Sequence, residues 1–310
     1  MSSIGIVTVV TNEKNNLKDF FDALVSQTLN DFTLYFVDNN SSDGSVQYFK
    51  ELNNPQRIPV EYITLDYNSG FSSGSNTGAK KAIEDGCEYL FIVNNDVVMD
   101  SRCLEELKKC IESDKEIVCS GLLLFKHKEK YPGVIQEFGG RINFKNGRLL
   151  KNYESAVYTE IKLPEYLDTD FVGGGACFIN SKIFESVGMY EEMYFGYFDE
   201  IDLSYRLKVL NNYKMRVTSR AIAYHNHNWT KKNKRSYYFE YFLSERNKFL
   251  YLKKFSLHLS VFTCWLSDSV KFPWRLIWFM KVCDFTLGLY YLRGMYAGLL
   301  NHKGKPKFVK

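Results

Sequence analysis

Four short segments rich in Asn, Asp, Ser and Gly stand out, and each follows a run of hydrophobic residues. They cover residues 11–13, 38–45, 68–78 and 94–96. Their carboxylate and amide oxygens are suited to hold hydroxyl groups or a hard cation, and their glycines let the backbone approach a ligand closely. Each segment alone is equally typical of a turn, because these residue types dominate turns for local reasons. Their repetition favours one ligand-binding site over four unrelated turns.

A second polar group, which is acidic, comes later in the chain. Asp199, Glu200 and Asp202 follow three consecutive glycines at residues 173–175. Carboxylates this close tend to raise the pKa of one member, which suits proton transfer. The structural alternative is an acidic first turn of a helix, with Asp202 pairing with Arg206 four residues on. We assign Asp202 and Arg206 to that structural role, which leaves Asp199 and Glu200 as the candidates for proton transfer.

The elements that must position these residues alternate between short hydrophobic strands and helical patterns. Strands are predicted at residues 4–10, 33–37, 60–65, 89–93 and 116–124, and helices at 17–25, 76–84 and 104–111. This alternation predicts an α/β fold with a mostly parallel sheet flanked by helices. Ligands bind at the carboxyl ends of the strands in such sheets, so we expect the four polar segments to lie together.

The pattern changes after residue 124. A hairpin is predicted at residues 141–150, a glycine-interrupted strand at 171–179, helices at 181–187 and 201–210, and a short last strand at 221–224. From about residue 231 the pattern is helical, basic and aromatic. We therefore divide the chain into one domain at 1–230, with halves of about 1–125 and 126–230, and a helical extension at 231–310.

The excess positive charge lies in the last third of the chain. Residues 1–203 contain 19 Lys and Arg against 32 Asp and Glu, whereas residues 204–310 contain 21 against 4. Between residues 237 and 300, 18 of 64 are Phe, Tyr or Trp. Basic and aromatic residues together suit an anionic membrane surface. Packing on the first domain, or on a second copy of the chain as a homo-oligomer, stays open. No nucleic-acid motif accompanies the basic run at 231–235, so no nucleic-acid partner is expected.

Composition excludes several classes of protein. The 310 residues are 45% hydrophobic and 25% charged, as in a packed globular protein, which excludes disorder and fibres. The sequence contains no apolar stretch of about 18 residues, which is the length that would predict a membrane-spanning helix. The seven cysteines lack CxxC spacing, which indicates reduced thiols. No basic segment precedes the first strand, so the pattern of a secretion signal is missing. We therefore expect a cytoplasmic protein. Neither GxGxxG after the first strand nor GxxxxGK[ST] occurs, so common nucleotide motifs are excluded.

The polar segments form an ordered series of motifs. The series is Val37-Asp38-Asn39-Asn40-Ser41-Ser42-Asp43-Gly44-Ser45, Asn68-x-Gly70-Phe71-x-x-Gly74-x-Asn76-x-Gly78, Asn94-Asn95-Asp96, Phe171-x-Gly173-Gly174-Gly175-Ala176, Tyr197-Phe198-Asp199-Glu200-Ile201-Asp202-Leu203-x-x-Arg206 and Ala223-Tyr224-His225. This collinear set resembles glycosyltransferase family 2, and within it the rhamnosyltransferase-like branch. It spans most of residues 1–230.

The resemblance implies a GT-A fold and an inverting transfer from a nucleotide-diphosphate sugar. Glu200 matches the catalytic base, with Asp199 in that role if the motif shifts by one residue. Asp96 and His225 match the positions that hold Mg²⁺ or Mn²⁺, although many members carry two carboxylates where this chain reads Asn94-Asn95-Asp96. The expected donor-binding residues are Thr11, Asn12, Asp38, Asn68, Gly70, Asn76, Asn94, Asn95 and Gly174, with Asp38 accepting a hydrogen bond from the base.

By the same resemblance, the expected donor is a dTDP- or UDP-sugar with rhamnose as the leading sugar. The expected acceptor is a glycan, lipid-linked, in the synthesis of a surface polysaccharide on the inner face of the cell membrane. Two alternatives stay open: a catalytically inactive sugar-nucleotide-binding scaffold, and a sugar nucleotidyltransferase. The latter needs a basic phosphate loop near the first strand, where residues 11–16 offer only Lys14.

Overall fold

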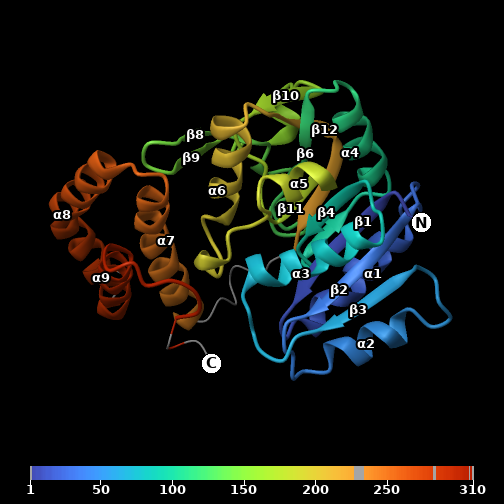
Figure 1. The fold of residues 1–310 in the computed structure, drawn as a ribbon, viewed down its shortest axis with the longest axis horizontal. Coiled ribbons are helices and arrows are strands. Elements are labelled where there is room, and N and C mark those ends of the chain that lie inside the picture. The colour runs from blue at the N-terminus through green and yellow to red at the C-terminus, as the bar shows by residue number, and fades with distance from the viewer. Residues whose placement is uncertain (1, 227–233, 282–283, 307, 309–310) are drawn as a thin grey trace.

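A ten-stranded mixed sheet forms the centre of the molecule, with three C-terminal helices beside it (Figure 1). The computed structural model describes residues 2–226, 234–281, 284–306 and 308. The predicted domain boundary after residue 230 and most of the basic run at 231–235 lie outside the described residues. The division of the chain at that point therefore stays a prediction.

The elements follow the predicted order closely in the first half. The strands are β1 (Ile4–Val10), β2 (Phe32–Asp38), β3 (Val60–Thr64), β4 (Tyr89–Val93), β5 (Val97–Met99), β6 (Ile117–Phe125), β7 (Ile135–Glu137), β8 (Gly140–Asn143), β9 (Arg148–Lys151), β10 (Tyr166–Thr169), β11 (Ala176–Asn180) and β12 (Lys214–His225). The helices are α1 (Leu17–Val25), α2 (Ser45–Leu52), α3 (Phe71–Glu84), α4 (Cys103–Glu112), α5 (Ser181–Ser186), α6 (Asp199–Tyr205), α7 (Lys234–Lys254), α8 (His258–Lys281) and α9 (Phe285–Leu299). Short 3₁₀ or π turns cover Lys14–Asn16, Tyr158–Glu160, Glu192–Tyr194 and Arg206–Leu210.

The first four strands pair in parallel, in the order β3-β2-β1-β4. Val10 is the register partner of Asp38, and Asp38 is the register partner of Thr64. Three strands therefore end at the same level, and the polar segments that follow them share one edge of the sheet. This confirms the predicted α/β architecture.

The second half of the sheet is mixed. Strand β11 runs antiparallel to both β4 and β6, while β12 pairs parallel with β6 and antiparallel with β10 and β5. The predicted strand at 171–179 begins only at Ala176, and the predicted strand at 221–224 is the end of the longer β12. Polar residues occupy the first part of β12, so its buried Met215 and Val217 gave too weak a hydrophobic signal.

Helices cover both faces of the sheet. Buried side chains of α1, α2 and α4 pack on one face, and those of α3, α5 and α6 pack on the other. Helix α3 begins five residues earlier than predicted, and it lies close to β1: a Cβ on Gly78 would come within 2.6 Å of Val7. Gly74 faces Val9 in the same way. These two glycines of the third motif therefore serve helix–sheet packing.

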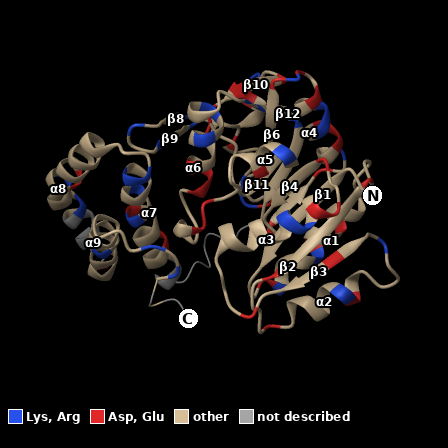
Figure 2. Cartoon of the chain, viewed as in Figure 1, with Lys and Arg blue, Asp and Glu red and all other residues tan. Residues whose placement is uncertain are grey.

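The C-terminal helices pack against one another and against the rest of the chain. Figure 1 shows α6 between the sheet and α7, and Lys254 of α7 pairs with Asp202 of α6 at 2.7 Å. The Tyr251 hydroxyl donates to the Phe144 carbonyl of the β8–β9 hairpin at 2.9 Å. Figure 2 shows Lys and Arg along these helices. Among the described residues, no helix has both the length and the apolar character needed to cross a membrane.

Candidate active site

A cleft of about 480 Å³ opens at the carboxyl ends of the parallel strands. Its lining comes from the strand-end segments, the glycine run before β11, the loop at 195–197 with the start of α6, the end of β12 and the start of α7. The lining residues are Val9, Thr11, Glu13, Asn39, Asn68, Gly70, Phe71, Asn94, Asn95, Asp96, Gly174, Gly175, Phe195, Gly196, Tyr197, Asp199, Glu200, His225, Phe239 and Glu240. Most of the residues predicted from the motifs are thus brought together.

Three predicted residues lie outside this lining, and each makes hydrogen bonds with nearby backbone. The Asn12 side chain accepts a hydrogen bond from the Ser42 amide at 2.8 Å, joining the first two strand-end segments. Asp38 is buried and accepts from the Ser41 amide at 3.1 Å. Asn76, buried on α3, bonds both the amide and the carbonyl of Tyr190. Their contacts are structural, and a donor-binding role for them stays a prediction.

Asn39 lines the cleft where the sequence favoured its neighbour Asp38. Its side chain is 2% exposed, accepts from the Ser69 amide at 2.8 Å and donates to Asn68 at 3.2 Å. Asn39 thereby joins the segments after β2 and β3. The quoted motif contains this residue, but the direction of its side chain depends on the loop conformation, in which Asn40 has a positive φ of 63°.

Asp96 and His225 meet at one side of the cleft. His225 Nε2 lies 3.1 Å from Asp96 Oδ2, and its Nδ1 lies 2.8 Å from the Gln136 amide nitrogen. Strand pairing places them together, because His225 at the end of β12 is the register partner of Val97 in β5. Within the described part of the chain, no three or more His, Cys, Asp or Glu side chains are grouped to hold a metal ion.

A carboxylate and an imidazole fit a divalent ion that takes its remaining ligands from a substrate. Mg²⁺ is commonly bound through one or two carboxylates together with substrate phosphates. Gln136, which the sequence did not indicate, supports His225 from behind, and its amide oxygen is buried without a hydrogen-bond partner. A ligating histidine needs such an outer partner to fix its orientation and tautomer.

The glycine run brings backbone against the side chain of Glu200. A Cβ on Gly174 would lie 2.5 Å from Glu200 Cγ, so only glycine fits there without displacing Glu200. Glu200 lines the cleft and also a second cavity of about 380 Å³. The second cavity includes Glu137, Lys151 and Phe171, and it shares Gly174, Gly175 and His225 with the first. Glu200 therefore stands at the junction of two cavities.

Asp199 differs sharply from its neighbour Glu200. Asp199 is 1% exposed and accepts a hydrogen bond from Ser72 of α3 at 3.2 Å. Burial, reinforced by the charge of Glu200, raises the pKa of Asp199 well above its usual range. Proton binding is thus favoured on Asp199, while Glu200 is half-buried and faces both cavities. The two carboxylates therefore differ in access: Asp199 is enclosed, whereas Glu200 reaches both cavities.

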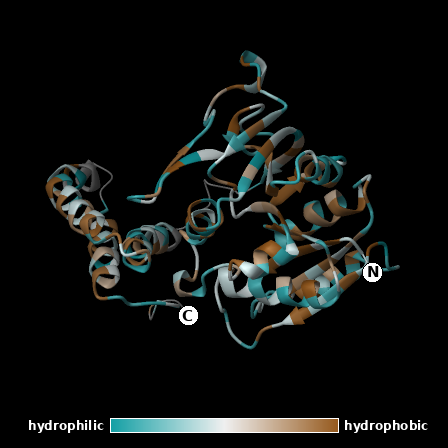
Figure 3. Cartoon of the chain, turned by 45° about the horizontal axis from the view of Figure 1, so that its top comes forward, coloured by the Kyte–Doolittle hydropathy of each residue, from teal (hydrophilic) through white to brown (hydrophobic). Residues whose placement is uncertain are grey.

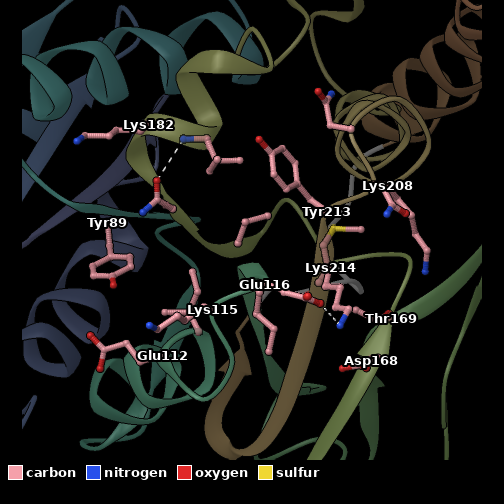
Figure 4. Close-up of a pocket in the computed structure, with 18 residues that line it drawn as sticks. Tyr89, Glu112, Lys115, Glu116, Asp168, Thr169, Lys182, Lys208, Tyr213 and Lys214 are labelled. Carbon is pink, nitrogen blue, oxygen red and sulfur yellow. Dashed lines mark hydrogen bonds and ion pairs between the residues drawn. The ribbon is translucent and has the colours of Figure 1, made fainter.

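A larger cavity of about 960 Å³ lies away from every predicted site residue (Figure 4). It lies where β4, β6 and β12 begin, at the opposite edge of the sheet from the cleft. Figure 4 shows Lys214 paired with Glu116, and Lys208 pairs with Asp170. Size alone therefore does not mark the active site, because none of the motifs contributes to this cavity.

The fold resembles those of several solved structures, two of which were determined with a nucleotide or nucleotide sugar and Mn²⁺. GalNAc-T7, solved with UDP, GalNAc and Mn²⁺, superposes with a TM-score of 0.62 at 14% identity over 82% of this chain and 48% of its own. The mannosyltransferase PcManGT from Pyrobaculum calidifontis, solved with GDP-Man and Mn²⁺, superposes with a TM-score of 0.58 at 10% identity over 97% and 88% of the two chains. TarS residues 1–349 from S. aureus give a TM-score of 0.53 at 14% identity over 81% and 65%. These likenesses identify the fold as GT-A.

Residues 5–188 match the family model of glycosyl transferase family 2, and the chain belongs to this family. A curated relative is the low-salt glycan biosynthesis hexosyltransferase Agl10 of Haloferax volcanii. The two are 22% identical over 212 residues, which cover 67% of this chain and 62% of Agl10. The chain therefore spans less than two thirds of the length of that relative.

Proposed function

We propose that the chain transfers a sugar from a nucleotide-diphosphate sugar to a hydroxyl group of a glycan acceptor, with inversion at the anomeric carbon. The position of Glu200 over Gly174, where the two cavities meet, is the observation that carries this proposal. A base there can serve a donor bound among the strand-end segments and an acceptor entering from the second cavity. Family membership and the GT-A fold support the sugar-nucleotide donor.

In the proposed reaction, Glu200 accepts the proton of the acceptor hydroxyl as its oxygen attacks the anomeric carbon. The bond between that carbon and the diphosphate oxygen breaks, and the nucleoside diphosphate leaves with the electron pair. Attack opposite the leaving group inverts the configuration. Burial and the charge of Glu200 raise the pKa of Asp199, which favours proton binding there over a second negative charge beside Glu200.

We propose Asp96 and His225 as the protein ligands of Mg²⁺ or Mn²⁺. When bound, the ion stabilises the negative charge of the leaving diphosphate. Ligation through His225 Nε2 requires the ring proton on Nδ1, and that proton requires an acceptor. A half-turn of the Gln136 amide would present its unpartnered oxygen to Nδ1. Gln136 is thus suited to support both tautomers of His225.

We further propose a dTDP- or UDP-sugar donor, with rhamnose leading, and a lipid-linked glycan acceptor in surface polysaccharide synthesis. The support is the resemblance of the motifs to the rhamnosyltransferase-like branch and the glycan biosynthesis named for Agl10. A scaffold that binds sugar nucleotides without turnover, and a sugar nucleotidyltransferase, are the alternatives that the test must separate.

Thermal unfolding with UDP, dTDP, GDP and CMP, each with and without Mn²⁺ or Mg²⁺, tests the donor site. A ligand at 100 times its dissociation constant stabilises a fold by about 2.7 kcal/mol, which is visible as a melting shift. We expect a metal-dependent shift with one pyrimidine diphosphate, and sugar transfer that Glu200→Gln abolishes. Binding without transfer to any glycan acceptor would favour the scaffold. Turnover of a sugar phosphate with a nucleoside triphosphate would favour the nucleotidyltransferase.

A second proposal concerns a hydrophobic stripe on α8, formed by Leu259, Phe262, Leu266, Val270 and Trp274. These residues are three or four apart, so they share one helix face, and Leu259 and Trp274 are 77% and 74% exposed. Figure 3 shows hydrophobic residues along the C-terminal helices, across the molecule from the N-terminus. We propose that this stripe lies on the anionic inner face of the cell membrane, where a lipid-linked acceptor would be presented.

Flotation with liposomes tests the stripe. Wild type should float with vesicles containing an anionic lipid, and the double variant Leu259→Ser, Trp274→Ser should not. Lys18 is an exposed polar residue of α1, so Lys18→Ser is the control and should float as wild type does. If the stripe instead joins two copies of the chain, the double variant should float as the wild type does. Light scattering should then show a dimer for the wild type and a monomer for the double variant.

A further inference from the structure

We propose that Asn247 and Arg246 of α7 are positioning residues for Glu200, so that the C-terminal helices complete the active site. They act on the loop at residues 194–198, which leads directly into Asp199 and Glu200 at the start of α6. The role of Glu200 rests on the proposed function. The contacts between α7 and the loop are independent of it.

The loop has an unusual backbone for its sequence. Phe195, Tyr197 and Phe198 have positive φ angles of 68°, 63° and 72°, and none of them is glycine. Aromatic residues rarely adopt this region, and such conformations persist only where the surroundings impose them. Three of them within four residues require strong external support just before the catalytic carboxylate.

Asn247 supplies that support from inside the protein. Its side chain is 0% exposed, and its amide nitrogen lies 3.1, 2.8 and 2.9 Å from the carbonyl oxygens of Tyr194, Gly196 and Tyr197. The two amide protons are therefore shared among three acceptors. Arg246 Nε donates to Asn247 Oδ1 at 2.9 Å, which fixes the amide so that its nitrogen faces the loop.

Arg246 anchors the same loop and joins it to the C-terminal end of the chain. It is 1% exposed, and its guanidinium donates to the carbonyls of Tyr194 and Gly304, both at 2.7 Å. Burial lowers its pKa to about 10, so the side chain remains a cation at neutral pH. A guanidinium presents several donors in a fixed plane, which suits it to hold two backbone carbonyls at once.

Helix α9 holds this part of α7 in place. A Cβ on Gly294 would come within 2.4 Å of the Phe242 carbonyl, and one on Gly298 within 2.5 Å of the Arg246 carbonyl. Glycine at both positions therefore lets the two helix backbones pack together closely. Support thus runs from α9 to α7, and from α7 to the loop.

The loop in turn contacts the opposite side of the cleft. The Phe195 carbonyl accepts from the Phe71 amide at 2.9 Å, and a Cβ on Gly70 would come within 2.3 Å of it. Phe239 of α7 packs edge-on against Phe195 and lines the cleft. The loop is therefore held between the donor-binding segments and α7, and this sets the position of Glu200 relative to a bound donor.

The test compares Asn247→Leu, which removes the amide, with Asn247→Asp, which keeps the acceptor for Arg246 but cannot donate to the carbonyls. Both should lower kcat by about 100-fold, because a displaced base loses its alignment, while the Kd of the nucleoside diphosphate stays within about threefold. Amide hydrogen exchange in residues 190–203 should become faster in both variants. Leu104→Ala on α4, a buried residue remote from the cleft and from α7, is the control for general destabilisation.

The Leu104→Ala control should keep kcat at temperatures where it is folded and leave exchange at 190–203 unchanged. Wild-type kcat in either Asn247 variant would overturn the proposal. Reduced kcat without faster exchange in the loop would overturn it too, because the loss would not act through the loop. If the wild type transfers no sugar, the proposed function fails, yet the exchange measurement still reports whether Asn247 holds the loop.

Discussion

The two walls of the cleft are held in different ways. The donor wall, formed by residues 11–13, 38–45 and 68–70, is tied by hydrogen bonds among its own segments, such as Asn12 to Ser42 and Asn39 to Ser69. The base wall, formed by residues 194–200, is tied to α7, with Asn247 bonding a carbonyl 50 residues earlier in the chain. One wall is supported locally at the ends of its strands, and the other depends on a docked helix.

This difference predicts how each wall fails. Damage to the donor wall should weaken nucleotide binding, because its segments are both the proposed binding surface and their own support. Damage to the base wall should slow the chemical step and leave nucleotide binding intact. The separation of effects on Kd and on kcat is therefore the measurement that tests the comparison.

The largest effect is expected at Glu200, the proposed base. Glu200→Gln keeps the size of the side chain but cannot accept the proton, so kcat should fall by about 10² to 10⁴-fold with an unchanged nucleotide Kd. Steady-state transfer rates and calorimetry of nucleotide binding check both parts. The exposed Glu51→Gln on α2 is the matched control and should behave as wild type. A wild-type rate in Glu200→Gln would show that Glu200 is not the base.

The next effect is expected at the glycine beneath the base. The Cβ of Gly174→Ala would lie 2.5 Å from Glu200 Cγ, so Glu200 must move. We expect kcat to fall by about 10- to 100-fold with little change in nucleotide Kd. Unchanged kcat would mean that Glu200 has freedom to shift, contrary to a rigid base wall.

A smaller effect is expected on the donor wall, and it should act on nucleotide binding and not on kcat. Asn39→Leu leaves the Ser69 amide without its buried acceptor, which should cost about 1–3 kcal/mol of unfolding free energy and weaken nucleotide binding. Asn39→Asp keeps that acceptor and loses the hydrogen bonds that the amide nitrogen donates to Asn68 and to the Gly70 carbonyl, so its loss should be smaller. Saturating donor should restore kcat in both. Loss of kcat at saturation would show that the two walls are not separable.

The last prediction concerns stability alone, which should depend on pH through Asp199. Because its pKa is raised in the folded state, the unfolded chain ionises first as the pH rises, and the unfolding free energy falls above about pH 4. Each unit of pKa shift corresponds to about 1.4 kcal/mol. Asp199→Asn removes this titration, so denaturant unfolding from pH 4 to 8 should show a flatter profile. Identical profiles would mean that Asp199 titrates normally.

Contiguous patterns made much of the fold predictable. The hydrophobic runs of β1, β2 and β4 and the periodic face of α1 are set by local residues, and their predicted bounds agree with the structure to within one residue. The short β5, β7 and β10 were missed, since strands of three or four residues depend on the partners they pair with. The predicted start of helix α3 lies five residues too far along the chain, because the glycines near its start obscure the helical pattern.

The site divides in the same way. The sequence determined which segments meet, because parallel strands bring Thr11, Asn68 and Asp96 to one edge whatever their loops do. It did not determine side-chain direction, so Asn39 lines the cleft in place of Asp38. Asn247 belongs to no sequence motif. Its acceptors are backbone carbonyls, and because every residue has one, the sequence does not indicate which carbonyls it will bind. Only tertiary structure decides which carbonyls those are, because docking of α7 brings distant backbone groups within hydrogen-bond reach.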